Sequence, residues 1–339
     1  MTSPFTRLAW AGAVCTYLLI ILGAVVRITG SGLGCGEHWP LCNGKLLPPL
    51  DDIGTLIEWN HRLAAAAVSV LVIALAGYAW RLRRETGDGT RETTDGPITP
   101  PSARPPVRPS AAAYIALGLL ALQVALGAVT VKLALPPWTV ILHLGTAMLL
   151  LATLIVVARG PRLTPGADRL TPGPAPLTPG ASPGLAAVRE SPGLRAGSVR
   201  AGLMGVWGAP GLRPGLVAVV LGFVTVLLGA LTANLGAATA CVGFPLCNGQ
   251  LLPDGNPLRL LQWTHRLLAY TLFGYVVWWA VRSRRGGVWA VAVLVTVQVV
   301  LAAAMVLLAL PRPLQAMHVA IGTGVWAALV LAVGGGRGR

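Results

Sequence analysis

Four histidines lie near one end of long apolar segments that hold few other ionisable residues: His61, His143, His265 and His318. An ionisable side chain in such a segment is costly unless it is paired or functional. Their surroundings recur, because Trp-x-His-Arg-Leu contains the first and third, and a glutamine precedes the second and fourth at equal distances. A single histidine of this kind is explained equally well by an interhelical hydrogen bond. Four in duplicated positions indicate pairs with a shared task.

Two imidazoles from two helices can supply both axial ligands of a six-coordinate heme. We therefore predict one heme site from His61 with His143 and a second from His265 with His318. Zinc is a weaker candidate, because no carboxylate or cysteine recurs at the same depth to complete a tetrahedral site.

Two arginines directly follow the first histidine of each pair, Arg62 and Arg266. They could bind heme propionates by charge-assisted hydrogen bonds, or extend towards lipid headgroups. His38 has no counterpart in the second half, where Phe244 or Pro245 takes its place, so we interpret it as a loop residue rather than a ligand.

The two copies differ in charge. Glu58 aligns with Gln262, and Arg27 aligns with Ala233. Glu58 precedes His61 by one helical turn, so both lie on one face, and a carboxylate beside a porphyrin can act as a general base or stabilise charge. An exposed loop carboxylate is the alternative interpretation. We assign the first half, with Arg27 and Glu58, to a heme substrate and the second half to a retained electron-transfer heme.

Cysteines occur as two close pairs, Cys35 with Cys42 and Cys241 with Cys247, in loops predicted on the outer side. That side is oxidising, so each pair is predicted to form a disulfide. The bridges could shape loops over the hemes, or take part in redox chemistry. Cys15 lies alone in the first apolar segment and is interpreted as a packing residue.

Whole blocks of the chain recur around these residues. Residues 35–66 and 241–269 share Pro-Leu-Cys-Asn-Gly-x-Leu-Leu-Pro followed by Trp-x-His-Arg-Leu, and residues 123–143 resemble 298–318. The pattern predicts a tandem duplication of a four-helix unit, with both copies in the same orientation.

The composition is that of a membrane protein: 55% of the 339 residues are hydrophobic and 11% are charged. Apolar segments near the length needed to cross a bilayer predict eight helices and an all-α integral membrane protein of two pseudo-symmetric four-helix bundles. The predicted helices are 8–26, 63–80, 111–131, 138–158, 214–233, 265–281, 287–310 and 314–333.

The basic residues predict the orientation. Most of the 26 Lys and Arg residues fall on the side that holds both chain ends, which the positive-inside rule makes cytoplasmic. The net charge of +15 is thus explained by topology and anionic lipid, without a nucleic-acid partner. We expect the protein in the cell membrane, with both termini cytoplasmic.

Two segments are too rich in Pro, Gly and polar residues to fold against the bundles. Residues 83–109 are predicted to form a cytoplasmic loop, and residues 160–211, with Leu-Thr-Pro-Gly three times, a disordered linker. The predicted organisation is therefore an N-terminal half 1–159, the linker 160–211 and a C-terminal half 212–339.

The chain resembles the heme A synthase family. The resemblance rests on the two similar four-helix halves, Glu-x-x-His-Arg at 58–62, a histidine near the start of each even-numbered helix, and the cysteine pairs of the first and third outer loops. It covers nearly the whole chain except residues 83–109 and 160–211.

The resemblance implies conversion of heme O to heme A for terminal oxidase assembly: the C8 methyl of the porphyrin is hydroxylated twice, and loss of water leaves a formyl group. It implies that His61 and His143 flank the substrate, that His265 and His318 ligate a heme b cofactor, and that Glu58 is catalytic.

Two other classes of function compete with this interpretation. A di-heme electron carrier of the cytochrome b kind would normally hold its hemes at two depths, whereas the four histidines share one. A quinone-linked disulfide oxidoreductase would leave the histidines unexplained. Expected partners are heme O, membrane lipid and an electron acceptor that the sequence does not name. A heme O synthase (protoheme farnesyltransferase) and a second copy of the chain are further candidates.

Overall fold

The computed structural model describes residues 3–48, 51–88, 109–160 and 212–334. Eight long helices account for most of this part of the chain, and a short 3-10 helix, η2 (Ala237–Thr239), follows α6. The long helices are α1 (Pro4–Thr29), α2 (Ile53–Asp88), α3 (Pro109–Lys132), α4 (Pro137–Arg159), α6 (Leu212–Asn234), α7 (Pro257–Ser283), α8 (Gly286–Leu307) and α9 (Arg312–Gly334).

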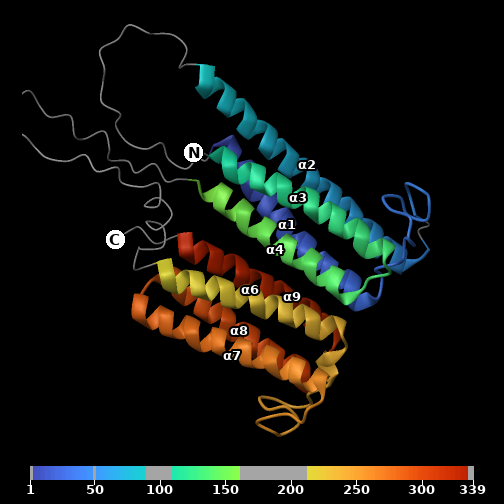
Figure 1. Ribbon diagram of the computed structural model, residues 1–339, viewed down its shortest axis with the longest axis vertical. Helices are drawn as coiled ribbons and strands as arrows, with labels where there is room; N and C mark the ends of the chain where they lie inside the picture. The colour runs from blue at the N-terminus through green and yellow to red at the C-terminus, as the bar shows by residue number, and fades with distance from the viewer. Residues whose placement is uncertain (1–2, 49–50, 89–108, 161–211, 335–339) are drawn as a thin grey trace, which may run out of the picture.

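The length and composition of these helices confirm a multi-pass membrane protein. Within the described residues, seven of them are long and apolar enough to cross a membrane, and α7 is the exception among the long helices. The first turns of α7 carry Arg259, Gln262, His265 and Arg266, which lower its hydropathy. Because α7 packs along both α6 and α8 (Figure 1), we interpret it as the eighth span.

The helices form two groups of four (Figure 1). In the first group, α1 contacts α2 and α4, and α3 completes the ring; α6 to α9 are arranged in the same way. The cysteine-containing loops after α1 and α6 project from one end of the molecule, whereas α1 begins and α9 ends at the other (Figure 1).

Two helices begin earlier than the apolar pattern predicts. The predicted starts near residues 63 and 265 are wrong, because α2 begins at Ile53 and α7 at Pro257. The side chain of Asn256 accepts hydrogen bonds from the first backbone amides of α7, and Asp52 does the same for Gly54 and Thr55. Bonds from the Thr55 hydroxyl and amide hold the pKa of Asp52 below its usual value. His61 and His265 thus lie about two turns inside their helices rather than at the helix starts.

The far end of α2 also differs from expectation. The predicted loop 83–109 starts too early, since α2 continues to Asp88 and α3 begins at Pro109. The predicted disordered linker lies outside the described residues, apart from Gly160, which ends α4 with φ 54°.

Direct contacts join the two groups of helices. The indole of Trp326 in α9 donates to the carbonyl of Met148 in α4 at 2.9 Å. The Tyr17 hydroxyl donates to the carbonyl of Ala320 in α9, at 3.0 Å. Helices α1 and α4 therefore pack on α9, which also carries His318.

Candidate heme sites

Each cysteine loop is closed by a two-residue hairpin turn. Asn43 and Gly44 both have positive φ, 50° and 75°, and Cys42 pairs with Lys45 in an antiparallel bridge. Asn-Gly is the preferred sequence for such a turn, because both positions need the left-handed region. Asn248 and Gly249 repeat the geometry, at 52° and 76°. The recurring Pro-Leu-Cys-Asn-Gly is thus explained by loop structure.

Glu58 binds the backbone of the first cysteine loop. Its Oε2 accepts from the amide of Cys35 at 2.7 Å, and its Oε1 pairs with Arg62 at 2.5 Å. Only 3% of Glu58 is exposed, so it is not the exposed loop carboxylate of the alternative interpretation. Gln262 repeats the contact, because its Oε1 accepts from the amide of Cys241 at 2.9 Å. Both residues therefore hold their loops.

Arg62 and Arg266, the two arginines beside the histidines, use most of their N–H groups to bind the same loops. The guanidinium of Arg62 donates to the carbonyls of His38 and Leu41 as well as to Glu58. Arg266 donates to the carbonyls of Gly243, Leu246 and Cys241. Few N–H groups of either guanidinium remain to bind a heme propionate. Both side chains bind loop carbonyls and so do not extend to lipid headgroups.

Arg27 is in a different situation. It lies in the last turn of α1, partly buried, and within the described residues no hydrogen bond or ion pair occupies its guanidinium. One turn earlier, Gly23 faces His61. Arg27 is therefore the cation beside the first histidine pair that is available to an anionic ligand, and the second half has Ala233 at this place.

The histidines lie at matching positions. His61 and His265 follow the starts of α2 and α7 at equal distances, and His143 and His318 do so in α4 and α9. The helices of each pair, α2 with α4 and α7 with α9, contact the same two neighbouring helices of their group. The structure thus brings together the pairs that the sequence predicts.

Glycines on neighbouring helices leave room for three of these rings. A Cβ at Gly229 would lie 2.7 Å from Cε1 of His265, and one at Gly23 or Gly127 would lie 3.2 Å from His61 or His143. Side chains at these positions would displace the imidazoles.

Glutamines contact the second histidine of each pair. The amide nitrogen of Gln123 lies 3.1 Å from Nε2 of His143, and that of Gln298 lies 3.1 Å from Nδ1 of His318. The amide nitrogen of Gln298 also lies 3.3 Å from Nε2 of His318 and donates to its backbone carbonyl at 3.0 Å. These glutamines therefore fix the position of the second imidazole in each pair. Their equal spacing from the histidines was visible in the sequence, but no role was assigned to it there.

Unpaired buried atoms gather at these pairs. Five buried side-chain polar atoms in the described residues have no hydrogen-bond partner: Gln123 Oε1, His143 Nδ1, His265 Nδ1, Gln298 Oε1 and Ser283 Oγ. A native fold rarely leaves such groups unpaired, so each asks for an explanation. Four of the five belong to the histidine and glutamine sets. Buried imidazole nitrogens without partners suit ligation of a heme in each half.

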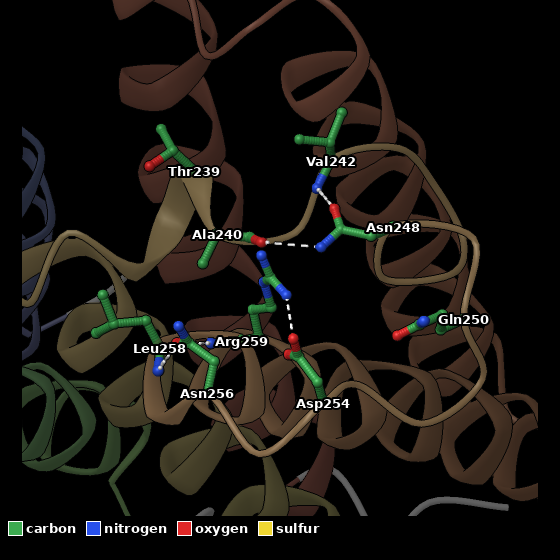
Figure 2. Close-up of a pocket in the computed structure, with 9 residues that line it drawn as sticks. All are labelled: Thr239, Ala240, Val242, Asn248, Gln250, Asp254, Asn256, Leu258 and Arg259. Carbon is green, nitrogen blue, oxygen red and sulfur yellow. Dashed lines mark hydrogen bonds and ion pairs between the residues drawn. The ribbon is translucent and has the colours of Figure 1, made fainter.

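A separate polar pocket lies beside the second cysteine loop (Figure 2). It measures about 500 Å³ and is lined by residues of the loop and the start of α7. Arg259 and Asp254 form an ion pair across it, and Asn248 bonds the backbone of Val242 and Ala240 (Figure 2). None of the predicted site residues lines this pocket.

Both predicted disulfides are present, Cys35–Cys42 and Cys241–Cys247. All four cysteines are at most 2% exposed. Thiol–disulfide exchange requires access for an attacking thiolate, so burial favours a structural role. Cys15 is not bonded and is partly buried.

Replacing Cys35 and Cys42 together by Ser is therefore expected to destabilise the first loop, by roughly 2 kcal/mol for a bridge of this kind. Purified yield and thermal stability should fall, and the heme spectrum of the second half should persist. Cys15→Ala, at a cysteine without a disulfide, serves as the control for yield, thermal stability and the second-half heme spectrum, all of which should stay unchanged. A double variant with full yield, stability and activity would exclude both roles of this bridge.

Eight long helices in two groups of four, seven of them long and apolar enough to cross a membrane, define a multi-pass helical membrane protein. The family model described as COX15-CtaA, cytochrome oxidase assembly protein, matches residues 6–188 and 198–330. The chain belongs to this family.

Individual relatives agree with this assignment. A heme A synthase from Symbiobacterium thermophilum is 30% identical over 323 residues, which are 92% of this chain and 89% of that protein. A heme A synthase from Bacillus licheniformis is 49% identical over 63 residues, 19% of this chain and 20% of that protein. A protoheme IX farnesyltransferase from Thermus thermophilus is 42% identical over 85 residues, 24% of this chain but only 14% of that protein.

Proposed function

We propose that this protein is a heme A synthase, an enzyme that oxidises the C8 methyl of heme O to a formyl group by successive hydroxylations for assembly of a terminal oxidase. The observation that carries the proposal is the set of buried, unpaired histidine and glutamine atoms in both halves. The full-length match to a protein named heme A synthase supports it.

The halves have different tasks in this proposal. His61 and His143 hold the substrate heme in the first half, where Arg27 is free to pair with a propionate. His265 and His318 ligate heme b in the second half. There, uncharged Ala233 and Gln262 stand in place of Arg27 and Glu58. When bound there, heme b would carry electrons one at a time between the first site and an external electron acceptor.

Glu58 has a positioning task and a chemical one. Its two bonds fix the carboxylate one helical turn before His61. A buried carboxylate held in this way can take a proton from the substrate as a general base. The Arg62 guanidinium, 2.5 Å from Oε1, holds the carboxylate in place.

The match to a farnesyltransferase covers too little of that protein to indicate association. We propose heme O as the substrate and retain a heme O synthase as a candidate partner. The start of α1 and the end of α9 lie opposite the cysteine loops (Figure 1), and this arrangement, with the distribution of basic residues, supports cytoplasmic termini in the cell membrane.

Heme analysis tests the proposal directly. The full chain is expressed in cells that make heme O but no heme A, and extracted hemes are separated by chromatography. We expect heme A, or its hydroxylated precursor, only in cells with the chain. A protein that binds two hemes but leaves heme O unchanged would instead be a di-heme electron carrier.

A further inference from the structure

We propose that a groove between α1 and α2 binds the farnesyl-derived tail of heme O and thereby selects heme O over heme B. The groove measures about 180 Å³ and is lined by Cys15, Leu18, Leu19, Leu22, Ala64 and Ala67. All six are apolar or small. This inference rests on the proposed function and names the part of the site that recognises the substrate.

The groove begins one helical turn from His61 along α2. Ala64 follows His61 by one helical turn in α2, and Leu22 precedes Gly23, which faces the imidazole of His61. The walls of the groove therefore belong to the helix that carries His61 and to the helix whose Gly23 faces it.

The order of residues along α1 matches the polarity of heme O. Arg27 lies one turn beyond Gly23, and the leucines of the groove lie on the other side of Gly23. A heme carries its propionates on one edge, and heme O carries its isoprenoid tail on the opposite edge. With the propionates near Arg27, the tail points into the groove, where burial of its apolar surface is favourable.

The second half has larger side chains at the positions that correspond to the groove. Aligned on His61 and His265, Ala64 corresponds to Leu268 and Ala67 to Thr271. Leu268 adds three carbon atoms to the wall, and the hydroxyl of Thr271 donates to the carbonyl of Leu267 at 2.8 Å. These larger residues narrow the place where a tail would lie, which suits heme b, a heme without a tail.

Binding titrations test the groove independently of turnover. Heme O and heme B are titrated into the detergent-purified full chain that already holds heme b in its second half, and binding is followed by absorbance. In Ala64→Leu and Ala67→Leu proteins, heme O should bind about tenfold or more weakly, as expected for added methylenes in an apolar pocket. Binding of heme B should change by less than about twofold.

Ala66→Leu is the matched control, because Ala66 is exposed on the same helix and does not line the groove. It should bind both hemes as the original protein does, and the heme b spectrum of the second half reports correct folding. Equal losses of heme O and heme B in the groove variants, or no loss in either, would overturn the proposal and leave the groove to lipid. Heme A formation by the unaltered chain still decides the proposed function.

Discussion

Heme A formation should fall by about 10²- to 10⁴-fold when Glu58 is replaced by Gln, as expected for loss of a general base. Heme O or a hydroxylated intermediate should accumulate in its place. The fold should tolerate the change, because Gln262 already accepts the bond of the equivalent loop amide, from Cys241. Extracted hemes and the heme b spectrum of the purified protein are the two measurements.

The control is Glu37→Gln, the same change at an exposed carboxylate of the same loop. It should leave heme A formation within about twofold of normal, since exposed charges of this kind contribute little. If Glu58→Gln also forms heme A at the normal rate, Glu58 acts only on the loop. Arg27 would then be the remaining charged difference between the halves.

Replacing His265 or His318 by Ala should abolish the low-spin heme b spectrum. Loss of one axial ligand leaves a five-coordinate iron, and the second-half pair provides two imidazoles only. Absorbance and bound-heme content of the purified protein measure the result. Heme A formation should fall with it, because the electrons from the substrate lose their carrier.

His38→Ala provides the control, because His38 lies in the first cysteine loop and contributes its backbone carbonyl to Arg62. The heme b spectrum of the His38→Ala protein should match that of the original protein. Retention of low-spin heme b by both His265→Ala and His318→Ala would place the cofactor elsewhere and remove the basis for assigning the second half to heme b.

The contacts of the recurring Trp-x-His-Arg motif show that most of its side chains bind the cysteine loops. In Trp-x-His-Arg, the indole of Trp59 donates to the carbonyl of Leu46 at 3.1 Å, and Trp263 donates to Leu251 at 3.0 Å. The arginine also binds loop carbonyls, so the histidine alone is left for the bundle. The tryptophan and the arginine of the motif therefore hold the loop, and the histidine is the residue available to bind a ligand.

The sequence by itself determined the helical membrane architecture and the duplicated blocks that carry the four histidines. These follow from local patterns: apolar length, repeated spacing and the cost of ionisable groups in lipid. Both disulfides were predictable for the same reason, since their cysteines are neighbours in the chain.

Only the tertiary structure decided what the charged residues contact. Sequence spacing placed Glu58 and Arg62 beside His61, but the loop backbone that binds them folds back from residues 35–42. The early starts of α2 and α7 were also hidden, because caps and polar first turns do not continue the apolar pattern. The groove beside Ala64 exists because α1 and α2 pack together, and no local pattern specifies the space between two helices.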